Sequence, residues 1–152
     1  MVNKYLSKMI IMNGTKVNNE IRALVPISFK TNMSILEYAI NGSIAKQHIR
    51  NATLVLRSNT DEAISELENA LKIDGKDPEA LTLMGKALMK NNRLEEALGY
   101  FTRAIDSDPK NTDAYSLRGM IRHMLGDKEG LSEDMGACSI IKEGNSKANG
   151  NG

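Results

Sequence analysis

Several residue types that define a function class are scarce in this chain. It has 152 residues, yet it contains one cysteine and no tryptophan, and aromatic residues make up only 4%. A single cysteine, Cys138, excludes an internal disulfide and a zinc site built from cysteines. We expect Cys138 to be a small buried side chain, and the lack of disulfides fits a cytoplasmic protein. No apolar run approaches the ~18 residues of a membrane-spanning helix, so no membrane insertion is expected.

A strong excess of one charge is also missing, because the formal net charge is +1. No general attraction to nucleic acid follows from it. The charges are unevenly spread, since residues 1–57 hold eight Lys or Arg against two acids, and residues 58–152 hold twelve against seventeen. The basic half could contact an acidic partner, a membrane surface or nucleic acid. We favour the simpler interpretation, in which these charges are solvated and attract the acidic helices beside them.

Residues that carry catalysis are not arranged for it. The two histidines, His48 and His123, stand far apart in the sequence, and a metal site would need further ligands that the sequence does not place beside them. Glu95–Glu96 and Glu133–Asp134 are typical of solvated helix faces. The glycines form no phosphate-binding loop, and no basic residues alternate with aromatic ones as in single-strand nucleic-acid binders. We therefore predict no enzyme activity, no metal and no cofactor.

The clearest pattern lies in residues 78–111. Asp77 followed by Pro78 predicts a helix start, and Asn92 predicts a second one. Asp108–Pro109 predicts the end of the second helix, because the residue before proline avoids the helical region. Apolar or small residues recur in both helices at the three- and four-residue spacing of one face. They are Leu81, Met84, Gly85 and Leu88 in the first, and Leu94, Ala97, Leu98, Phe101, Ala104 and Ile105 in the second.

Small residues in this pattern alternate with large ones. Gly85, Ala97 and Ala104 stand where Leu and Phe side chains of the facing helix need room. Two helices that approach so closely pack at the density of an organic crystal. A larger residue at Gly85 should therefore overpack the pair and destabilise the protein by roughly 1–3 kcal/mol.

This arrangement resembles a tetratricopeptide repeat over a full 34-residue period. The matching residues are Leu81, Met84, Gly85, Leu88, Ala97, Phe101, Ala104 and Pro109. Leu81 replaces the usual tryptophan, and Met84 replaces the usual leucine. The resemblance implies an all-α fold, a right-handed superhelix of antiparallel helix pairs whose first helices line a concave groove.

The pattern returns more weakly on both sides. One repeat period later, Tyr115 and Gly119 fit it, whereas Arg122 and Leu131 depart from it. The places one period earlier hold Gln47, Arg50 and Asn51 in the first helix, and Ala63, Leu67, Ala70 and Leu71 in the second. The second-helix residues fit well and the first-helix residues fit poorly. We predict three repeats, 44–77, 78–111 and 112–143, with atypical outer copies.

The two ends of the chain are less regular. We expect residues 1–33 to be irregular or extended and partly disordered. The remaining expected segments are a short capping helix and turn over 34–43 that ends at Asn41–Gly42, a repeat helix capped by Ser43 and running from Ile44 to about Arg57, and a flexible tail over 144–152.

The resemblance also implies which residues face the groove and bind the partner. These are Glu79, Thr82, Lys86, Met89 and Lys90 in the central repeat, Asp113, Ser116, Met120, His123 and Met124 in the last, and His48, Ala52, Val55 and Leu56 in the first. Apart from Glu79 and Asp113, helical spacing puts them on the side away from the second helices. The three methionines suit varied apolar ligands. Alternatively, the N-terminal segment or a second copy of the chain covers them.

Some members of the family bind the C-terminal carboxylate of heat-shock chaperones with Lys, Asn and Arg side chains in the groove. The corresponding places here hold His48, Ala52, Leu83, Asp113 and Leu117. We therefore predict that this chain is not a carboxylate-clamp co-chaperone.

Three functions remain at this stage. The first is a non-catalytic adaptor or scaffold that binds a peptide or protein segment in the groove. The second is a structural subunit that self-associates through exposed repeat ends, where Ile140 and Ile141 lack a covering helix. The third and least favoured is an enzyme-associated domain with its activity in the first 43 residues.

Overall fold

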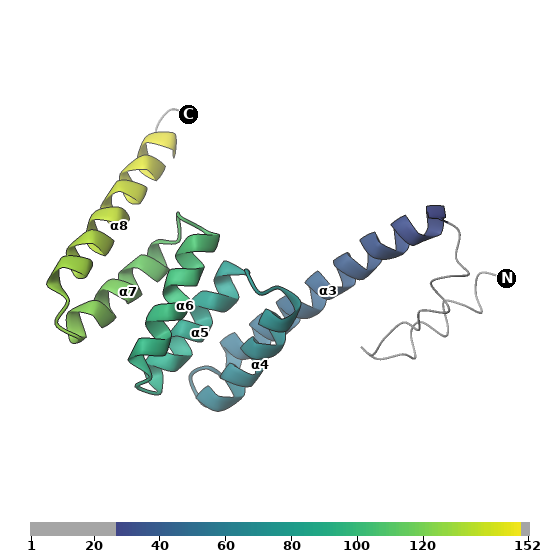
Figure 1. Ribbon diagram of the computed structural model, residues 1–152, viewed down its shortest axis with the longest axis horizontal. Helices are drawn as coiled ribbons and strands as arrows, with labels where there is room; N and C mark the ends of the chain where they lie inside the picture. Colours follow the sequence, from purple (N-terminus) through teal and green to yellow (C-terminus); the bar gives the residue numbers. More distant parts are fainter. Residues whose placement is uncertain (1–26, 150–152) are drawn as a thin grey trace. The chain divides into compact units, whose positions relative to one another are not determined.

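A computed structural model describes the backbone of residues 27–149 and the side chains of residues 34–146. This part of the chain is all α-helical, which confirms the predicted fold class (Figure 1). The helices are α3 (Ile27–Val55), α4 (Thr60–Ile73), α5 (Pro78–Lys90), α6 (Leu94–Ser107), α7 (Thr112–Met124) and α8 (Lys128–Asn149). The chain divides into two compact units, residues 1–39 and 40–152, and helices α4–α8 lie entirely in the second.

The joint between α5 and α6 is a closed turn rather than the predicted Asn92 helix cap. Asn92 has a φ of 58°, a left-handed conformation that asparagine tolerates better than most residues. Its N–H donates to the carbonyl of Met89 at 3.0 Å, and the N–H of Arg93 donates to the carbonyl of Leu88 at 2.9 Å. This pair of bonds satisfies the last carbonyls of α5 and lets the chain reverse.

The same turn recurs one repeat period later, between α7 and α8. Gly126 takes the place of Asn92, with a φ of 83°. Its N–H donates to the carbonyl of His123 at 3.0 Å, and the N–H of Asp127 donates to the carbonyl of Arg122 at 2.8 Å. The repeat is therefore present in the backbone hydrogen bonds as well as in the side chains.

Helix α6 begins with an ion pair instead of a side-chain cap. Arg93 precedes the helix and donates through Nε and Nη2 to the two carboxylate oxygens of Glu96, each at 2.7 Å. These hydrogen bonds lower the pKa of Glu96 below its ordinary value. Both side chains are exposed to solvent, so we assign them a local role at the turn.

The core lies between the helix pairs and contains mostly alanine, leucine and one phenylalanine. The largest fully buried apolar side chains are those of Phe101, Leu67, Leu81, Met84 and Ile121. A Cβ atom added at Gly85 would lie 2.6 Å from the Phe101 ring. The close approach of α5 and α6 therefore requires glycine at this position, as the sequence predicts.

Helix α3 corrects the expected N-terminal segments. It is continuous from Ile27 to Val55, so the predicted extended segment over 27–33, the turn at Asn41–Gly42 and the cap at Ser43 are wrong. A glycine inside a helix costs only about 1 kcal/mol relative to alanine, so helix-forming neighbours on both sides override it. The expectations for residues 1–26 lie outside the described residues.

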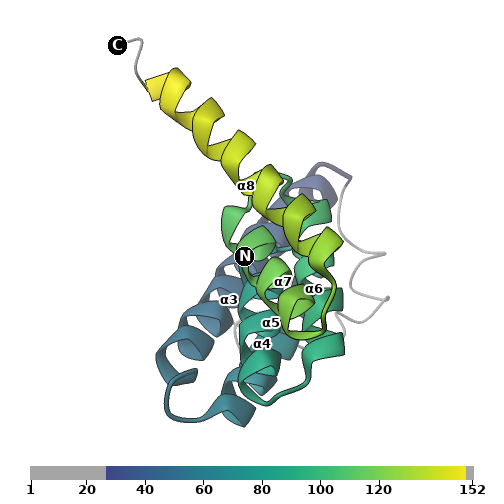
Figure 2. The same cartoon turned by 90° about the vertical axis from the view of Figure 1, so that its left-hand side faces the viewer.

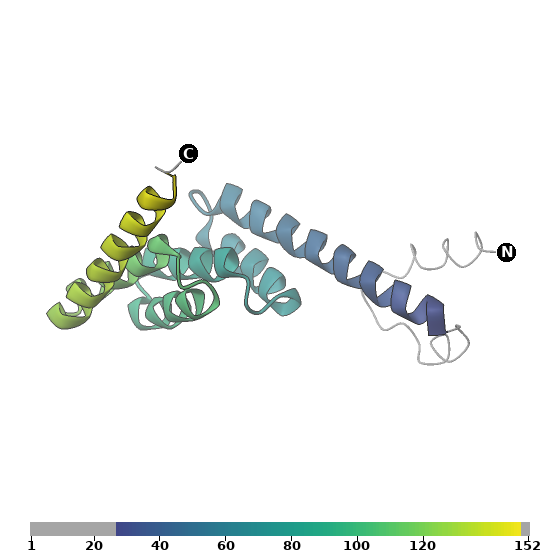
Figure 3. The ribbon, with the colours of Figure 1, turned by 90° about the horizontal axis from the view of Figure 1, so that it is seen from above.

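The predicted flexible tail is also corrected, because α8 continues to Asn149. A helix that is anchored in its first turns extends without a new nucleation step. In Figures 2 and 3 the C-terminal part of α8 runs on beyond α7, which is the shorter helix. Residues 150–152 lie outside the described part of the chain.

The register of α3 differs from that of the later first helices. Its core residues are Ala45, Ile49 and Ala52, and Leu56 is half-buried against the same cluster. Ile49, Ala52 and Leu56 precede the core residues of α5, Leu81, Met84 and Leu88, by slightly less than one repeat period. Counting one full repeat period back from the core residues of α5 gives positions in α3 that are exposed or half-buried. The poor sequence match of the first repeat is therefore a shift in register and not a loss of its apolar face.

We predict opposite effects for two Gly→Ala substitutions in the central pair. Gly85→Ala should lower the free energy of unfolding by roughly 1–3 kcal/mol, because the new methyl group meets the Phe101 ring. Gly99→Ala is the control, since no neighbouring atom lies within 4 Å of its Cβ position in α6. It should raise the free energy of unfolding by about 0.5–1 kcal/mol. Urea unfolding followed by circular dichroism measures both, and changes of equal sign would contradict the close approach.

Candidate functional site

Helices α3, α5 and α7, which the sequence predicts to line the groove, are joined in order by polar contacts. Lys86 on α5 pairs with Asp113 on α7, with 3.2 Å between Nζ and Oδ2. Lys90 at the end of α5 donates from Nζ to the carbonyls of Leu56 and Arg57, at 2.9 and 2.8 Å. The three first helices are thus linked side by side through α5.

A shallow depression of about 420 Å³ lies at the start of α5 and α7. It is lined by Pro78, Glu79, Thr82, Leu83, Lys86, Asp108, Lys110, Asn111, Thr112 and Asp113. Three of the predicted groove residues of the central repeat and one of the last therefore surround one hollow. Its walls mix three carboxylates with two ammonium groups, so this end of the groove has no dominant charge.

Two of the predicted groove residues serve the packing of the repeats. Thr82 is only 6% exposed, and its Oγ1 donates to the carbonyl of Pro78 at 2.7 Å while accepting from Nδ2 of Asn111 at 2.9 Å. Ser116 lies 3.4 Å from Sγ of Cys138 on α8. We assign both hydroxyl groups to contacts between helices, because their hydrogen bonds are already made inside the fold.

The exposed predicted residues gather on α7. Met120 and Met124 are 52% and 59% exposed, and His123 between them is exposed as well. Met89 on α5 is half-buried and packs against the core. Two methionines and a histidine at this spacing share one helix face. They form an adaptable apolar surface with a polar border, which we call the methionine face of α7.

The first repeat presents different residues from those expected. His48 lies against α4, with 2.6 Å between its Nδ1 and Oε2 of Glu66, and Ala52 is buried. Val55 and Leu56 are half-buried against the core cluster. These four side chains therefore belong to the packing of α3, because its register is shifted.

With the register observed in α3, other residues fall on the groove side. The places equivalent to Glu79, Thr82 and Lys86 hold Gln47, Arg50 and Leu54, and all three are exposed. Arg57, which is also exposed, lies in the turn that follows α3. Leu54 is 79% exposed, more than Met120 or Met124. The apolar spacing of Ile49, Ala52 and Leu56 in the sequence already indicates this register. A count of one full repeat period from α5 does not detect it.

A buried ionic cluster in the last helix pair corrects the interpretation of Asp134 as a solvated acid. Asp134 is 1% exposed and accepts from Arg118 through Nε and Nη2, at 3.2 and 2.7 Å. Arg122 lies 3.2 Å from the other carboxylate oxygen and donates to the carbonyl of Gly130 at 3.0 Å. The side chains of Arg118 and Arg122 are 14% and 23% exposed, so both are half-buried around the buried carboxylate. Arg122 also lies 3.7 Å from Asp127 and 3.6 Å from Glu133.

This cluster explains the weak match of the last repeat. Arg118, Arg122 and Asp134 stand one repeat period after Met84, Leu88 and Tyr100. Three side chains of the central repeat are thus replaced together by three charged side chains that pair. The packing geometry survives because each charge finds a partner, as a buried ion must.

No group of three His, Cys, Asp or Glu side chains in the described residues is placed to hold a metal ion. The thiol of Cys138 is buried and lies 3.5 Å from the carbonyl of Thr112. None of the helices in the described part combines the length and apolar character needed to cross a membrane. The candidate site is the surface of α5 and α7 around the depression, with the exposed residues of α3.

Comparison with known proteins identifies the repeat directly. A family model described as tetratricopeptide repeat matches residues 54–121. That segment begins near the end of α3 and ends within α7, so it contains the α5–α6 pair completely. No curated protein matches the chain.

Solved structures similar to this chain share its fold at low identity. The second tetratricopeptide domain of Spaghetti (RPAP3), bound to the HSP90 peptide SRMEEVD, has a TM-score of 0.65 and 22% identity, with 69% of this chain and 98% of that chain covered. The OM64 domain of Arabidopsis has a TM-score of 0.65 and 19% identity, covering 72% and 91%. MamA has a TM-score of 0.63 and 20% identity, covering 74% and 65%. At such identity the likeness establishes the fold alone.

We predict that Asp134→Ala lowers the free energy of unfolding by about 3–5 kcal/mol, because it removes the buried carboxylate that the half-buried Arg118 and Arg122 share. Glu133→Ala is the matched control, since that side chain is 69% exposed, and it should change stability by less than about 0.5 kcal/mol. Chemical denaturation of both variants measures the difference.

A triple variant tests the origin of the cluster. Arg118→Met, Arg122→Leu and Asp134→Tyr together restore the residues of the central repeat, and the variant should be as stable as the parent or more so. Retention of a cooperative transition is the expected result. An unfolded triple variant would show that the charges are not a replacement for apolar packing.

Proposed function

We propose, from the premise that this chain belongs to the tetratricopeptide repeat family through residues 54–121, that it is a non-catalytic module which binds a peptide or protein segment in the groove of α3, α5 and α7. Its role is that of an adaptor or scaffold, and we place it in the cytoplasm because it has a single, buried cysteine.

One observation carries this proposal. Each of the three first helices places a side chain at the same groove position, Leu54 on α3, Lys86 on α5 and Met120 on α7. Lys86 is partly covered by its ion pair, whereas the two apolar side chains are more than half exposed. Exposed apolar residues that recur along aligned helices are typical of a binding surface for an extended or helical segment.

The predicted groove residues of this chain differ from those of a clamp that binds a C-terminal carboxylate. RPAP3 is similar in fold, and its solved structure contains an HSP90 peptide. The places that would hold the clamp in the last two repeats are occupied by Leu83, Asp113 and Leu117. Asp113 would repel a carboxylate, and its charge is already matched by Lys86. We therefore propose a partner other than a carboxylate-clamp chaperone ligand.

Self-association through the repeat ends is a second candidate function, favoured by Ile140, which is 73% exposed on α8. The outer side of the same helix opposes it. Exposed Ser132 and Ser139 stand one repeat period after Leu98 and Ile105, which pack in the core of the central pair. A further helix would thus meet hydroxyl groups where the inner repeat offers apolar side chains, so we rank this function second.

Selected peptides provide the test of the groove. Peptides from a random display library that bind the immobilised protein should lose at least about tenfold in affinity for the variant Leu54→Ala, Met120→Ala, Met124→Ala, because these side chains supply the exposed apolar contact. Ile140→Ala is the matched control, since it removes a similarly exposed apolar side chain from α8. Fluorescence anisotropy measures each affinity, and equal losses in both variants would reject the groove.

Light scattering tests the second candidate separately. We expect a constant monomer mass over a broad concentration series, and the same mass for Ile140→Ser, because the serine-bearing outer face offers no apolar match. A mass that rises with concentration and returns to the monomer value in Ile140→Ser would instead establish association through α8.

A further inference from the structure

We infer that the groove binds an acidic segment that carries an apolar anchor. Arg50 and Arg57 contact its acidic residues on one side, and the methionine face of α7 contacts its apolar anchor on the other. A free C-terminal carboxylate is not required. This inference rests on the proposed groove function and specifies the chemistry of its partner. It follows from the observed register of α3 and from how charge is divided between the two kinds of helix.

Two arginines lie on and just after α3. Arg50 is exposed at the helix position equivalent to Thr82, where a step of one full repeat period gives His48. Arg57 is exposed in the turn that follows α3, seven residues after Arg50. Neither guanidinium group has an acidic partner among the described residues. Their charges are therefore available to a ligand.

Neighbouring cations extend this basic side. Lys90 stands beside Arg57, because its Nζ donates to the carbonyl of that residue at 2.8 Å. A carbonyl acceptor leaves the charge of the ammonium group in place. Lys86 is further along α5, and Asp113 neutralises it in part. The C-terminal ends of α3 and α5 thus form a positive edge of the groove.

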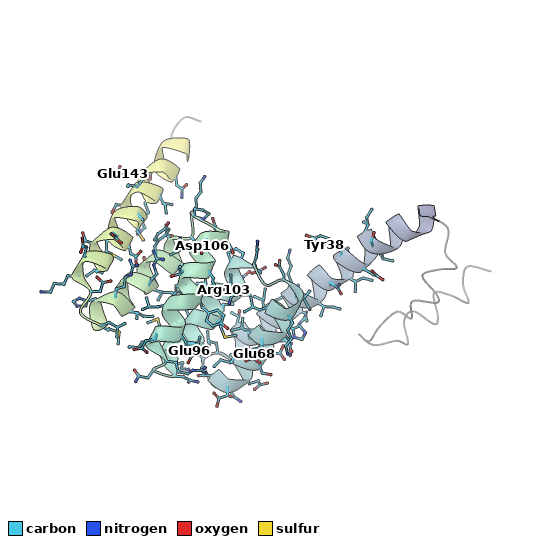
Figure 4. The ribbon with its side chains drawn as sticks, viewed as in Figure 1. Tyr38, Glu68, Glu96, Arg103, Asp106 and Glu143 are labelled. Carbon is cyan, nitrogen blue, oxygen red and sulfur yellow. The ribbon has the colours of Figure 1, made fainter. Side chains whose placement is uncertain are left out.

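The second helices carry the opposite charge. Helices α4 and α6 hold seven acidic residues against Lys72 and Arg103. The acids are Asp61, Glu62, Glu66, Glu68, Glu95, Glu96 and Asp106. Figure 4 marks four of these exposed charged side chains, Glu68 on α4 and Glu96, Arg103 and Asp106 on α6. An acidic segment is therefore repelled from these helices and attracted to the first ones.

Apolar contact then fixes the other part of the ligand. Met120 and Met124 lie on α7. On the other side Leu54 follows Arg50 on α3, and Arg57 lies in the turn after that helix. Flexible thioether side chains adapt to aliphatic and aromatic anchors of several shapes. Glu79 and Asp113 at the start of α5 and α7 oppose an acid at that end. We therefore place the acidic residues of the partner near the C-terminal ends of α3 and α5.

Synthetic peptides test this chemistry directly. The probe is a fluorescein-labelled peptide in which glutamates alternate with leucine and phenylalanine, compared with versions carrying lysine or glutamine for glutamate. We expect the acidic peptide to bind at least about tenfold more tightly than the lysine version, with a difference that shrinks as salt rises. Amidation of its C-terminus should leave the affinity unchanged, and a large loss on amidation would overturn the inference in favour of a carboxylate clamp.

Charge reversal supplies the decisive comparison. The double variant Arg50→Glu, Arg57→Glu should lose the acidic peptide about tenfold or more and gain affinity for the lysine peptide. Lys72→Glu, Arg103→Glu on α4 and α6 is the matched control, since it makes the same change in net charge on exposed residues of the second helices. Equal losses in the two variants would mean that only net charge acts, and would overturn the inference.

The possible failures are distinguishable. If acidic, neutral and basic peptides bind alike but all weaken when Met120 and Met124 become alanine, the groove function stands and this inference falls. If no peptide binding responds to any substitution on α3, α5 or α7, the proposed function falls with it. Circular dichroism melting curves of each variant exclude loss of the fold as the cause, because all the substituted side chains are at least partly exposed.

Discussion

The contact between Gly85 and the Phe101 ring is the constraint on which the repeat domain depends. A Cβ atom at Gly85 would lie 2.6 Å from the ring, so α5 and α6 approach as closely as backbone and aromatic atoms allow. Such proximity sets the orientation of the pair, and it buries alanines on both helices at the density of a close-packed interior. The same proximity holds the first helix of the pair at a fixed spacing from the second one.

The last pair keeps this geometry by another physical route. Its small residue is Gly119, and the side chains of Asp134 and Met135 lie 3.2 and 3.3 Å from the Cβ position there. The apolar partners of the central repeat are replaced by two arginines around one buried carboxylate. A buried ion pair contributes little net stability, but it tolerates few alternative arrangements.

Charge is divided between the first and the second helices of the pairs in a way that packing alone does not require. The second helices α4 and α6 are acidic, whereas Arg50 on α3, Arg57 in the turn after it and Lys90 on α5 are exposed and basic. In the sequence this division appears only as a basic first part and an acidic remainder, which we interpreted as solvated charge. The fold places these charges on different helices. Charge on a surface of this kind governs which partners approach, and apolar contacts then decide how long they stay.

The sequence by itself determined the helical fold class, the central pair and the requirement for glycine at position 85, because these follow from spacing and size within one repeat. It determined the exposed methionines of α7 for the same reason. Only the tertiary structure decided the register of α3, the continuity of that helix through Gly42 and the burial of Asp134. Each of these depends on which neighbour a side chain meets across the helix pair, and a repeat step counted along the chain contains no information about that neighbour.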